Sequence, residues 1–221
     1  MQGVIKTWGM VYFRSQFTGG NMERPVTTLF MLMSVDGKIS TGAADELDMD
    51  RDLPLIDGVK EGLHQYYEIE QTTDLWSFNT GRVQEKMGVN EKEMPAKTPV
   101  SFVILDNRHL TEHGVRYFCA RSKQAVVITS NPSHPAFQVS ESNLHIIYQE
   151  TQSLKEALAR LKRECGCERL TVQSGGKDTS TLNDGTSLTA KKELSGLGAL
   201  KLEECSVLED SYIRLRYKVI S

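Results

Sequence analysis

Five consecutive residues, Ser34 to Lys38 (SVDGK), combine a hydroxyl, a carboxylate and an ammonium group. They follow an apolar run at 26–34 that has the length of a strand. The Asp36-Gly37 pair is typical of a tight turn, so Ser34 and Asp36 could present polar groups to a bound molecule where that strand ends. An ordinary strand-ending turn would show the same residues, and both interpretations stay open at this point.

A second polar group follows the next predicted strand. Asn79 closes the apolar segment 74–79, and Thr80, Gly81 and Arg82 come directly after it. A helix that begins here would direct backbone N–H groups outward beside a guanidinium, which is a common way for proteins to bind anions. A plain helix cap explains the segment equally well.

Two later segments of strand character end in residues that could contact a nucleotide. Hydroxyl groups suit a phosphate or a ribose, and paired glycines let the backbone approach a pyrophosphate closely. These residues are Thr129 and Ser130 at the end of segment 124–130, and Gly175 and Gly176 after segment 170–174. Each pair also fits an ordinary turn, and a lone Gly-Gly is not the G-x-G-x-x-G fingerprint.

The sequence lacks the motifs of several other enzyme classes. It has no GK[ST] P-loop and no G-x-S-x-G nucleophile elbow. His109 and His113 occur as HLTEH rather than HExxH. Cys165 and Cys167 have no second Cys or His pair at zinc spacing. No metal site is therefore expected.

The elements that must position these residues alternate between strand and helix. The predicted strands cover 26–34, 74–79, 100–106, 124–130, 144–148 and 170–174, and the predicted helices cover 57–71 and the segment that follows Ser153. This order predicts an α/β domain with a mostly parallel central sheet flanked by helices. In such sheets ligands bind beyond the carboxyl ends of the strands, where the residues named above would lie.

The boundaries of two elements carry specific signals. Ser153 and Glu156 form a capping box at the start of a helix, and Gly166 supplies its left-handed stop. Near the end of the chain, 199–208 and 212–219 alternate apolar and polar residues on either side of a short turn. We therefore expect the α/β domain to close with a C-terminal antiparallel hairpin.

Composition limits the class of protein. The chain has 221 residues, of which 39% are hydrophobic and 25% are charged, and this is typical of a soluble globular protein. The net charge of −3, without a basic block, argues against nucleic acid as a partner. No apolar run approaches the ~20 residues of a membrane helix, and the N-terminus lacks the apolar core of a secretory signal, so no membrane contact and a cytoplasmic location are expected. Four cysteines are too few for a disulfide framework.

Several motifs, taken together, resemble one family. The most specific is Arg24-Pro25 followed by Met33 to Lys38, which reads M-S-x-D-G-K. The other matching segments are Asp74, Gly81-Arg82, Leu105 to Arg108, Leu170 to Gly176, Leu200 to Leu202 and Tyr217. Over residues 24–221 the chain thus resembles the reductase domain of bacterial riboflavin biosynthesis, which has a dihydrofolate-reductase-like fold.

This resemblance implies an NADPH-dependent reductase that transfers hydride to a ribosylamino-pyrimidine, or to a related pterin-like heterocycle, and that forms a homodimer. The family's M-S-x-D-G segment implies a catalytic position at Asp36 and substrate binding at Ser34, Gly37 and Lys38. The family's cofactor-binding positions match Asn79, Thr80, Gly81, Arg82, Thr129, Ser130, Ser174, Gly175 and Gly176.

The sequence departs from the family after Gly176. There the family continues with a crossover helix, a strand and a second Gly-Gly, whereas this chain proceeds directly to Lys177-Asp178. We therefore expect residues 23–221 to form a single reductase-like domain that lacks one helix and one strand, with residues 1–22 as an N-terminal extension. A non-catalytic or truncated paralogue that serves as a binding or oligomerising module is the alternative function.

Overall fold

The structure is a computed structural model that describes residues 8–15, 23–34, 53–55, 60–151, 153–173 and 199–220. The chain forms two compact units. The first unit holds β1 (Trp8–Ser15), β2 (Val26–Ser34), η1 (Leu53–Leu55), α2 (His64–Glu70), β8 (Ala199–Val207), η4 (Glu209–Ser211) and β9 (Tyr212–Ile220). The second holds β3 (Trp76–Thr80), α3 (Gly81–Lys86), β4 (Ser101–Leu105), α4 (Glu112–Arg121), β5 (Ala125–Thr129), η2 (Pro135–Gln138), β6 (Leu144–Tyr148), α5 (Leu154–Cys165) and β7 (Arg169–Val172).

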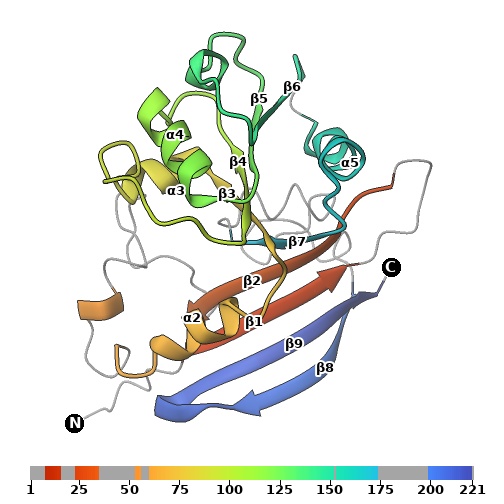
Figure 1. Cartoon of the computed structure of the whole chain (residues 1–221). Coiled ribbons are helices and arrows are strands. Elements are labelled where there is room, and N and C mark those ends of the chain that lie inside the picture. The colour runs from red at the N-terminus through yellow and green to blue at the C-terminus, as the bar shows by residue number, and fades with distance from the viewer. Residues whose placement is uncertain are drawn as a thin grey trace. The chain divides into compact units, whose positions relative to one another are not determined.

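The second unit is built on a parallel sheet with the strand order β6-β5-β4-β3-β7. Each neighbouring pair in this order is parallel. Parallel neighbours need crossover connections, and helices provide them. Helices α3 and α4 lie on one side of the strands and α5 on the other (Figure 1). The predicted α/β fold with a mostly parallel sheet and flanking helices is confirmed.

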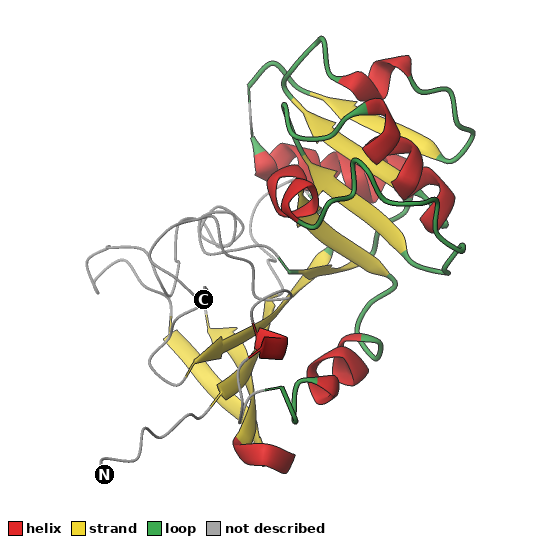
Figure 2. Ribbon diagram, turned by 90° about the vertical axis from the view of Figure 1, so that its left-hand side faces the viewer, coloured by secondary structure: helices red, strands yellow, loops and turns green. Residues whose placement is uncertain are grey.

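Apolar residues cover both faces of this sheet. On one face, alternate strand residues such as Ile104 and Val127 form a buried cluster with Val115 and Phe118 of α4. The intervening residues are buried as well, so that all of β5 is inaccessible to solvent. Figure 2 shows helices on both sides of these strands. Burial on both faces explains why the strands read as nearly continuous apolar runs rather than as alternating ones.

The helix signals in the sequence have mixed outcomes. The hydroxyl of Ser153 accepts a hydrogen bond from the Glu156 backbone N at 3.3 Å, and Gly166 ends α5 with φ of 73°, so both predicted boundaries are confirmed. Helix α2 begins at His64, later than the predicted start, and α4 was not predicted. The α4 cap is the hydroxyl of Thr111, which accepts from the Gly114 backbone N at 3.2 Å.

The first unit carries four strands in the order β2-β1-β9-β8. Strands β8 and β9 are antiparallel, as the predicted C-terminal hairpin requires. Strand β1 pairs in parallel with β9, with Trp8 opposite Tyr212. The sequence analysis assigned no element to residues 1–22, because their alternation is short and is broken by the following Gly-Gly. Long-range pairing with β9, rather than a local pattern, explains the strand at 8–15.

The core of the first unit is aromatic. The ring of Phe30 stacks on Tyr66 of α2 with centroids 4.8 Å apart, and Leu63 and Tyr212 belong to the same buried cluster. Gly62 precedes α2 at the point where this helix approaches the start of β9. A Cβ on Gly62 would lie 2.6 Å from the ring of Tyr212, so the close approach requires glycine there.

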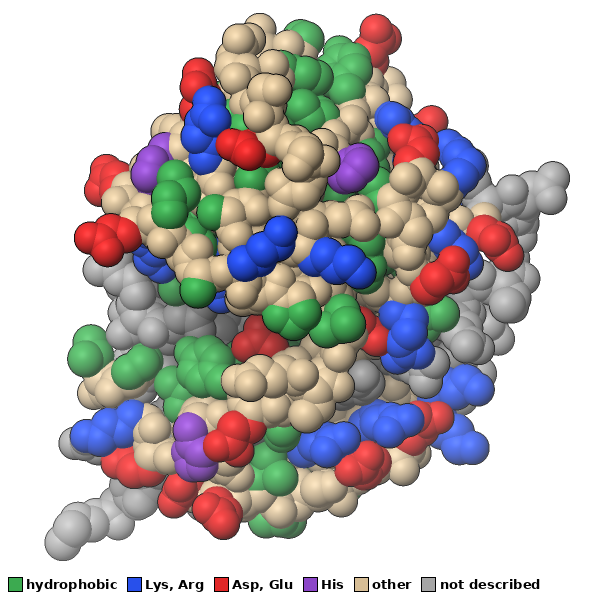
Figure 3. Space-filling model, viewed as in Figure 1, with side chains coloured by type: hydrophobic (Ala, Val, Ile, Leu, Met, Phe, Trp, Pro, Cys, Tyr) green, Lys and Arg blue, Asp and Glu red, His purple; other side chains and the backbone are tan. Residues whose placement is uncertain are grey.

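Acidic and basic side chains are interspersed over the visible face of the described residues (Figure 3), in keeping with the net charge of −3. None of the described helices is both long and apolar enough to cross a membrane. All four cysteines are free thiols.

Candidate functional site

The carboxyl edge of the parallel sheet in the second unit brings together residues from distant parts of the sequence. Strands β3, β4, β5 and β7 run in the same direction, so their last residues meet at this edge. Two predicted groups therefore lie on one edge, Asn79 to Arg82 after β3 and Thr129 with Ser130 after β5. We call this region the cofactor edge, since the sequence analysis predicted cofactor binding at both groups.

The end of β3 is polar although it is buried. Asn79 is 9% exposed, and its side-chain amide donates to the hydroxyl of Ser77 at 3.1 Å. That hydroxyl in turn donates to Gln173, which follows β7, at 2.8 Å. The chain of hydrogen bonds fixes the Asn79 carboxamide relative to the neighbouring strand. Thr80 precedes α3 without capping it through its side chain, and Arg82 is exposed in the first turn of that helix.

Asp106, directly after β4, has several hydrogen-bond partners at this edge. The sequence placed Asp106 to Arg108 at the end of a predicted strand, where ligands are expected, but assigned Asp106 no specific role. The residue is 3% exposed, and its carboxylate accepts hydrogen bonds from three consecutive backbone N–H groups, Arg108 at 3.2 Å, His109 at 3.0 Å and Leu110 at 2.8 Å. Nε2 of His134 lies 2.9 Å from the same carboxylate. The sequence offers only a weak signal for this, an Asp at a strand end.

The protonation states of this pair follow from its hydrogen bonds. Nδ1 of His134 accepts from the backbone N of Ala136 at 3.0 Å, so Nε2 carries the hydrogen that it donates to Asp106. Burial raises the pKa of Asp106, but the hydrogen bonds from His134 and the three backbone N–H groups outweigh burial and hold that pKa below its ordinary value. Asp106 is therefore ionised, and hydrogen bonds from the protein replace the water that would otherwise surround its carboxylate.

Gly81 has a structural reason to be glycine. A Cβ at this position would overlap with the carboxyl group of Asp106. The start of α3 can therefore approach the end of β4 only when residue 81 lacks a side chain. The predicted role of Gly81 in cofactor binding stays a prediction, and its packing against Asp106 is a separate and sufficient cause for a glycine.

Asn107 joins the ends of β4 and β5. Its side-chain oxygen accepts from the Thr129 hydroxyl at 3.0 Å and from the Ser130 backbone N at 2.8 Å, and the Ser130 hydroxyl donates to it at 3.2 Å. The Thr129 hydroxyl also accepts from the backbone N of Asn131 at 3.1 Å, and the residue is 1% exposed. The polar group of Thr129 is thus engaged inside the protein, whereas Ser130 is half-buried at the surface of the edge.

The remaining predicted site residues cannot be placed in this way. Asp36, Gly37, Lys38, Ser174, Gly175 and Gly176 lie outside the described residues, and Ser34 is described only through its backbone at the end of β2. The segment after Gly176, where a helix and a strand were expected to be missing, also lies outside the described residues. Their roles stay predictions.

Two exposed arginines give the cofactor edge a positive character. Arg82 follows β3, and Arg108 follows the adjacent strand β4. The guanidinium of Arg108 makes no ion pair within the part of the chain that the structure describes. Exposed guanidinium groups beside a sheet's carboxyl edge suit the phosphates of a nucleotide.

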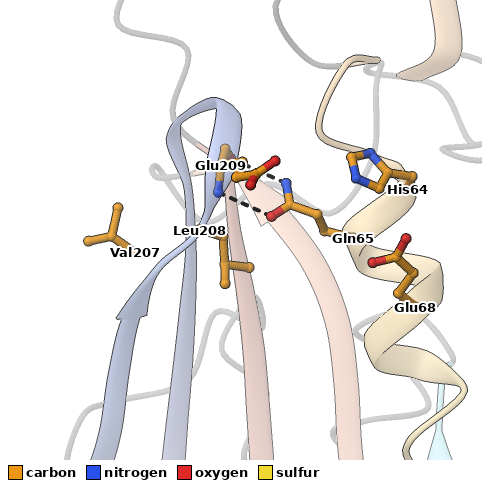
Figure 4. Close-up of a pocket in the computed structure, with 6 residues that line it drawn as sticks. All are labelled: His64, Gln65, Glu68, Val207, Leu208 and Glu209. Carbon is orange, nitrogen blue, oxygen red and sulfur yellow. Dashed lines mark hydrogen bonds between the residues drawn. The ribbon is translucent and has the colours of Figure 1, made fainter.

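A separate hollow of about 590 Å³ lies in the first unit, between the start of α2 and the end of the hairpin (Figure 4). Its lining residues are His64, Gln65, Glu68, Val207, Leu208 and Glu209. The side chain of Gln65 bonds to the backbone of Glu209 in both directions, at 3.2 Å and 3.1 Å, and so fixes the turn of the hairpin against α2. No predicted site residue lines this hollow.

The two histidines of the HLTEH segment have different partners. Nδ1 of His109 lies 2.8 Å from a carboxylate oxygen of Glu85, and Nε2 of His113 lies 2.7 Å from the carbonyl oxygen of Lys92. Among the described residues no cluster of three or more His, Cys, Asp or Glu side chains could hold a metal ion.

Comparison with known families identifies the chain. The model of the family described as "RibD C-terminal domain" matches residues 25–184. The chain belongs to the RibD C-terminal domain family. The family predicted from the Arg-Pro and M-S-x-D-G-K motifs is thereby confirmed, and the match includes the whole cofactor edge. A comparison with curated proteins finds no match.

Two solved structures are similar to this RibD C-terminal domain. One is a diaminohydroxyphosphoribosylaminopyrimidine deaminase/5-amino-6-(5-phosphoribosylamino)uracil reductase from Thermotoga maritima, with 16% identity, a TM-score of 0.49 and coverage of 84% of this chain. This chain spans 54% of that protein. The other is the riboflavin biosynthesis reductase Rib7 of Saccharomyces cerevisiae, with 10% identity, a TM-score of 0.37, and coverage of 93% of this chain and 86% of that one.

The lowered pKa of Asp106 predicts how the stability of this RibD C-terminal domain depends on pH. A carboxylate whose pKa is lower in the folded state stabilises that state above its unfolded pKa, near 3.8, and loses this contribution as the pH falls through the folded pKa. Urea unfolding at several pH values should therefore show that Asp106→Asn is less stable than wild type at pH 7. The difference should shrink below about pH 4. Parallel stability curves would contradict this prediction.

Proposed function

We propose that the chain is an NADPH-dependent reductase of riboflavin biosynthesis whose substrate is 5-amino-6-(5-phosphoribosylamino)uracil. The observation that carries this proposal is membership of the RibD C-terminal domain family over residues 25–184. In the proposed reaction NADPH would supply a hydride and water would supply a proton, and together they would reduce the ring-opened ribose to a ribityl chain. The cofactor supplies the hydride, and the protein binds and orients the two reactants.

The cofactor edge supports NADPH as the bound nucleotide. Arg82 and Arg108 can bind its phosphates through charge-assisted hydrogen bonds, and the buried carboxamide of Asn79 is held in place for a polar group of the cofactor. Ser130 lies half-buried on the same edge. Thr129 contributes to the proposed site through Asn107 rather than by direct contact, because its hydroxyl is already engaged on both sides.

The substrate side of the proposal rests on the M-S-x-D-G segment. Ser34 ends β2, and Asp36, Gly37 and Lys38 follow it in sequence. In the tight turn that the sequence predicts here, a carboxylate and an ammonium group would suit the polar ring edge and the phosphate of a ribosylamino-pyrimidine. Asp36 is the proposed catalytic position.

Binding of NADPH is the first test. Titration of the wild-type protein, followed by nicotinamide fluorescence, should give saturable binding with a micromolar Kd. Arg82→Ala should raise that Kd about tenfold, because the loss of one charge-assisted hydrogen bond costs about 1.5–3 kcal/mol. Arg163→Ala is the matched control, since Arg163 is an exposed arginine in the last turn of α5, before β7 begins at the opposite edge of the sheet. Absence of NADPH binding to wild type would overturn the proposed function and favour a non-catalytic binding module.

The role of Asp36 is tested by turnover. Asp36→Ala should lower kcat/KM for 5-amino-6-(5-phosphoribosylamino)uracil by about tenfold or more, because a hydrogen bond from the substrate to a charged group is lost. The melting temperature should change little, since a turn carboxylate contributes little packing. Asp36→Asn keeps the shape of the side chain but removes its charge, so this variant distinguishes the effect of the charge from the effect of the contact. An unchanged kcat/KM would remove Asp36 from the site.

We further propose that the chain forms a homodimer through the β8–β9 hairpin. The register places Leu202, Cys205 and Val207 opposite Tyr217, Leu215 and Ile213. These apolar pairs share one face of the hairpin, and Leu202 and Val207 are 49% and 81% exposed. The charged residues Glu204 and Arg214 form an ion pair at 3.6 Å among the intervening residues. Among the described strands β8 lies at the end of the strand order, and an edge strand beside an apolar face favours association with a second copy.

Sedimentation equilibrium tests the dimer. The wild-type protein at micromolar concentration should have twice the 24.8 kDa mass of one chain. Val207→Glu should shift the mass toward one chain, because a carboxylate would be buried without a partner. Lys201→Glu on the same strand is the matched control, because Lys201 lies opposite Lys218 on the other face of the hairpin, and it should leave the dimer intact. A wild-type protein with the mass of one chain would contradict the homodimer.

A further inference from the structure

Asp106 and His134 form a buried, hydrogen-bonded pair that no part of the proposed reaction uses. Both side chains are 0% exposed, and Nε2 of His134 lies 2.9 Å from Oδ2 of Asp106. A buried carboxylate is costly unless it is fully hydrogen-bonded, and here an imidazole and three backbone N–H groups satisfy it. Because the carboxylate has a complete set of partners, the network holds the backbone and side chains at this edge of the sheet in one arrangement.

The hydrogen bonds of Asp106 occupy the backbone donors of the turn after β4. Consecutive N–H groups of this kind commonly form a concave site for a ligand anion. Here the N–H groups of Arg108, His109 and Leu110 donate to the protein's own carboxylate instead. A phosphate beside this turn therefore has to be bound by side chains such as that of Arg108, whose backbone Asp106 holds in place.

We propose that Asp106 and His134 are positioning residues for the cofactor. They fix the backbone from which Arg108 projects and the start of α3 that carries Arg82, without touching the cofactor themselves. This inference rests on the proposed function.

The contact with Arg108 is direct. The Arg108 backbone N donates to Oδ1 of Asp106 at 3.2 Å, while the guanidinium is exposed. The backbone of Arg108 is therefore held, and the charged end of its side chain is accessible to an anion. A change at Asp106 would release this turn without removing the arginine.

The contact with α3 is steric. The carboxyl group of Asp106 packs so closely on Gly81 that no Cβ could be accommodated there. Arg82 is the next residue of the chain, so the position of its side chain depends on how the Asp106 carboxyl group is oriented. His134, in the turn after β5, sets that orientation through its hydrogen bond to Oδ2.

Cofactor affinity and thermal stability together test the proposal. Asp106→Asn should raise the Kd and the KM for NADPH about tenfold, which corresponds to about 1.4 kcal/mol. It should leave kcat at saturating NADPH within about twofold of wild type, because misplaced binding groups weaken cofactor binding rather than the hydride step. His134→Ala should raise the Kd in the same direction, and His134→Gln should restore most of the affinity because its amide can still donate to the carboxylate.

Asp74→Asn is the matched control. The side chain of Asp74 is 8% exposed and forms an ion pair with Arg169 at 2.6 Å, but it precedes β3 and therefore lies at the opposite edge of the same sheet. This variant should lower the melting temperature without a change in the Kd for NADPH. A purely structural role for Asp106 would give the two variants the same behaviour.

Each outcome decides the matter. If wild type binds NADPH and Asp106→Asn binds it with unchanged Kd, or if Asp74→Asn weakens binding equally, the positioning role is overturned and the proposed function stands. If wild type binds no NADPH, the proposed function fails and the positioning role fails with it. If Asp106→Asn does not fold, His134→Ala decides, and an unchanged Kd in that variant overturns the proposal.

Discussion

The hydrogen bonding of the Asp106 carboxylate is the constraint on which the cofactor edge depends. A buried charge has to be compensated, and Asp106 obtains its compensation from the turn after β4 and from His134 after β5. The same carboxyl group leaves room only for a glycine at position 81. Three loops that belong to different strands are therefore fixed relative to one another by a single side chain.

Asn107 extends this arrangement by one residue. Its side-chain oxygen accepts hydrogen bonds from the Thr129 hydroxyl and the Ser130 backbone N, and these bonds hold the end of β5 against the end of β4. Asn79 is fixed in the same manner through Ser77 and Gln173. The polar residues of this edge thus include some that satisfy one another inside the protein, and two arginines, Arg82 and Arg108, whose side chains are exposed at its surface. Such a division is what a preorganised binding surface requires, because ordered binding groups lose little entropy when a ligand arrives.

The two units differ in how their strands are stabilised, and this explains which elements were predictable. The central strands of the second unit, such as β5, are buried on both faces, so their apolar runs are visible in the sequence. Strand β6 is only partly buried, but it too agrees with its predicted bounds. Strand β1 depends on parallel pairing with β9, in which Trp8 lies opposite Tyr212. The two strands are about two hundred residues apart in the sequence, so no local pattern predicts the pairing. Helix α4 begins at the Thr111 cap, which lies in a polar stretch without a strong apolar period.

The sequence by itself determined the α/β class, the closing hairpin and the family, because periodicity, the Ser153 cap and the M-S-x-D-G-K motif are local properties of the chain. It also placed Asn79 to Arg82 and Thr129 with Ser130 at strand ends. Only the tertiary structure showed that Asp106 is bonded to His134 and Asn107 to Thr129, since these hydrogen bonds join residues more than twenty positions apart. A strand-end aspartate looks like any other turn residue until folding removes it from water, and burial then decides which backbone and side-chain groups must surround it.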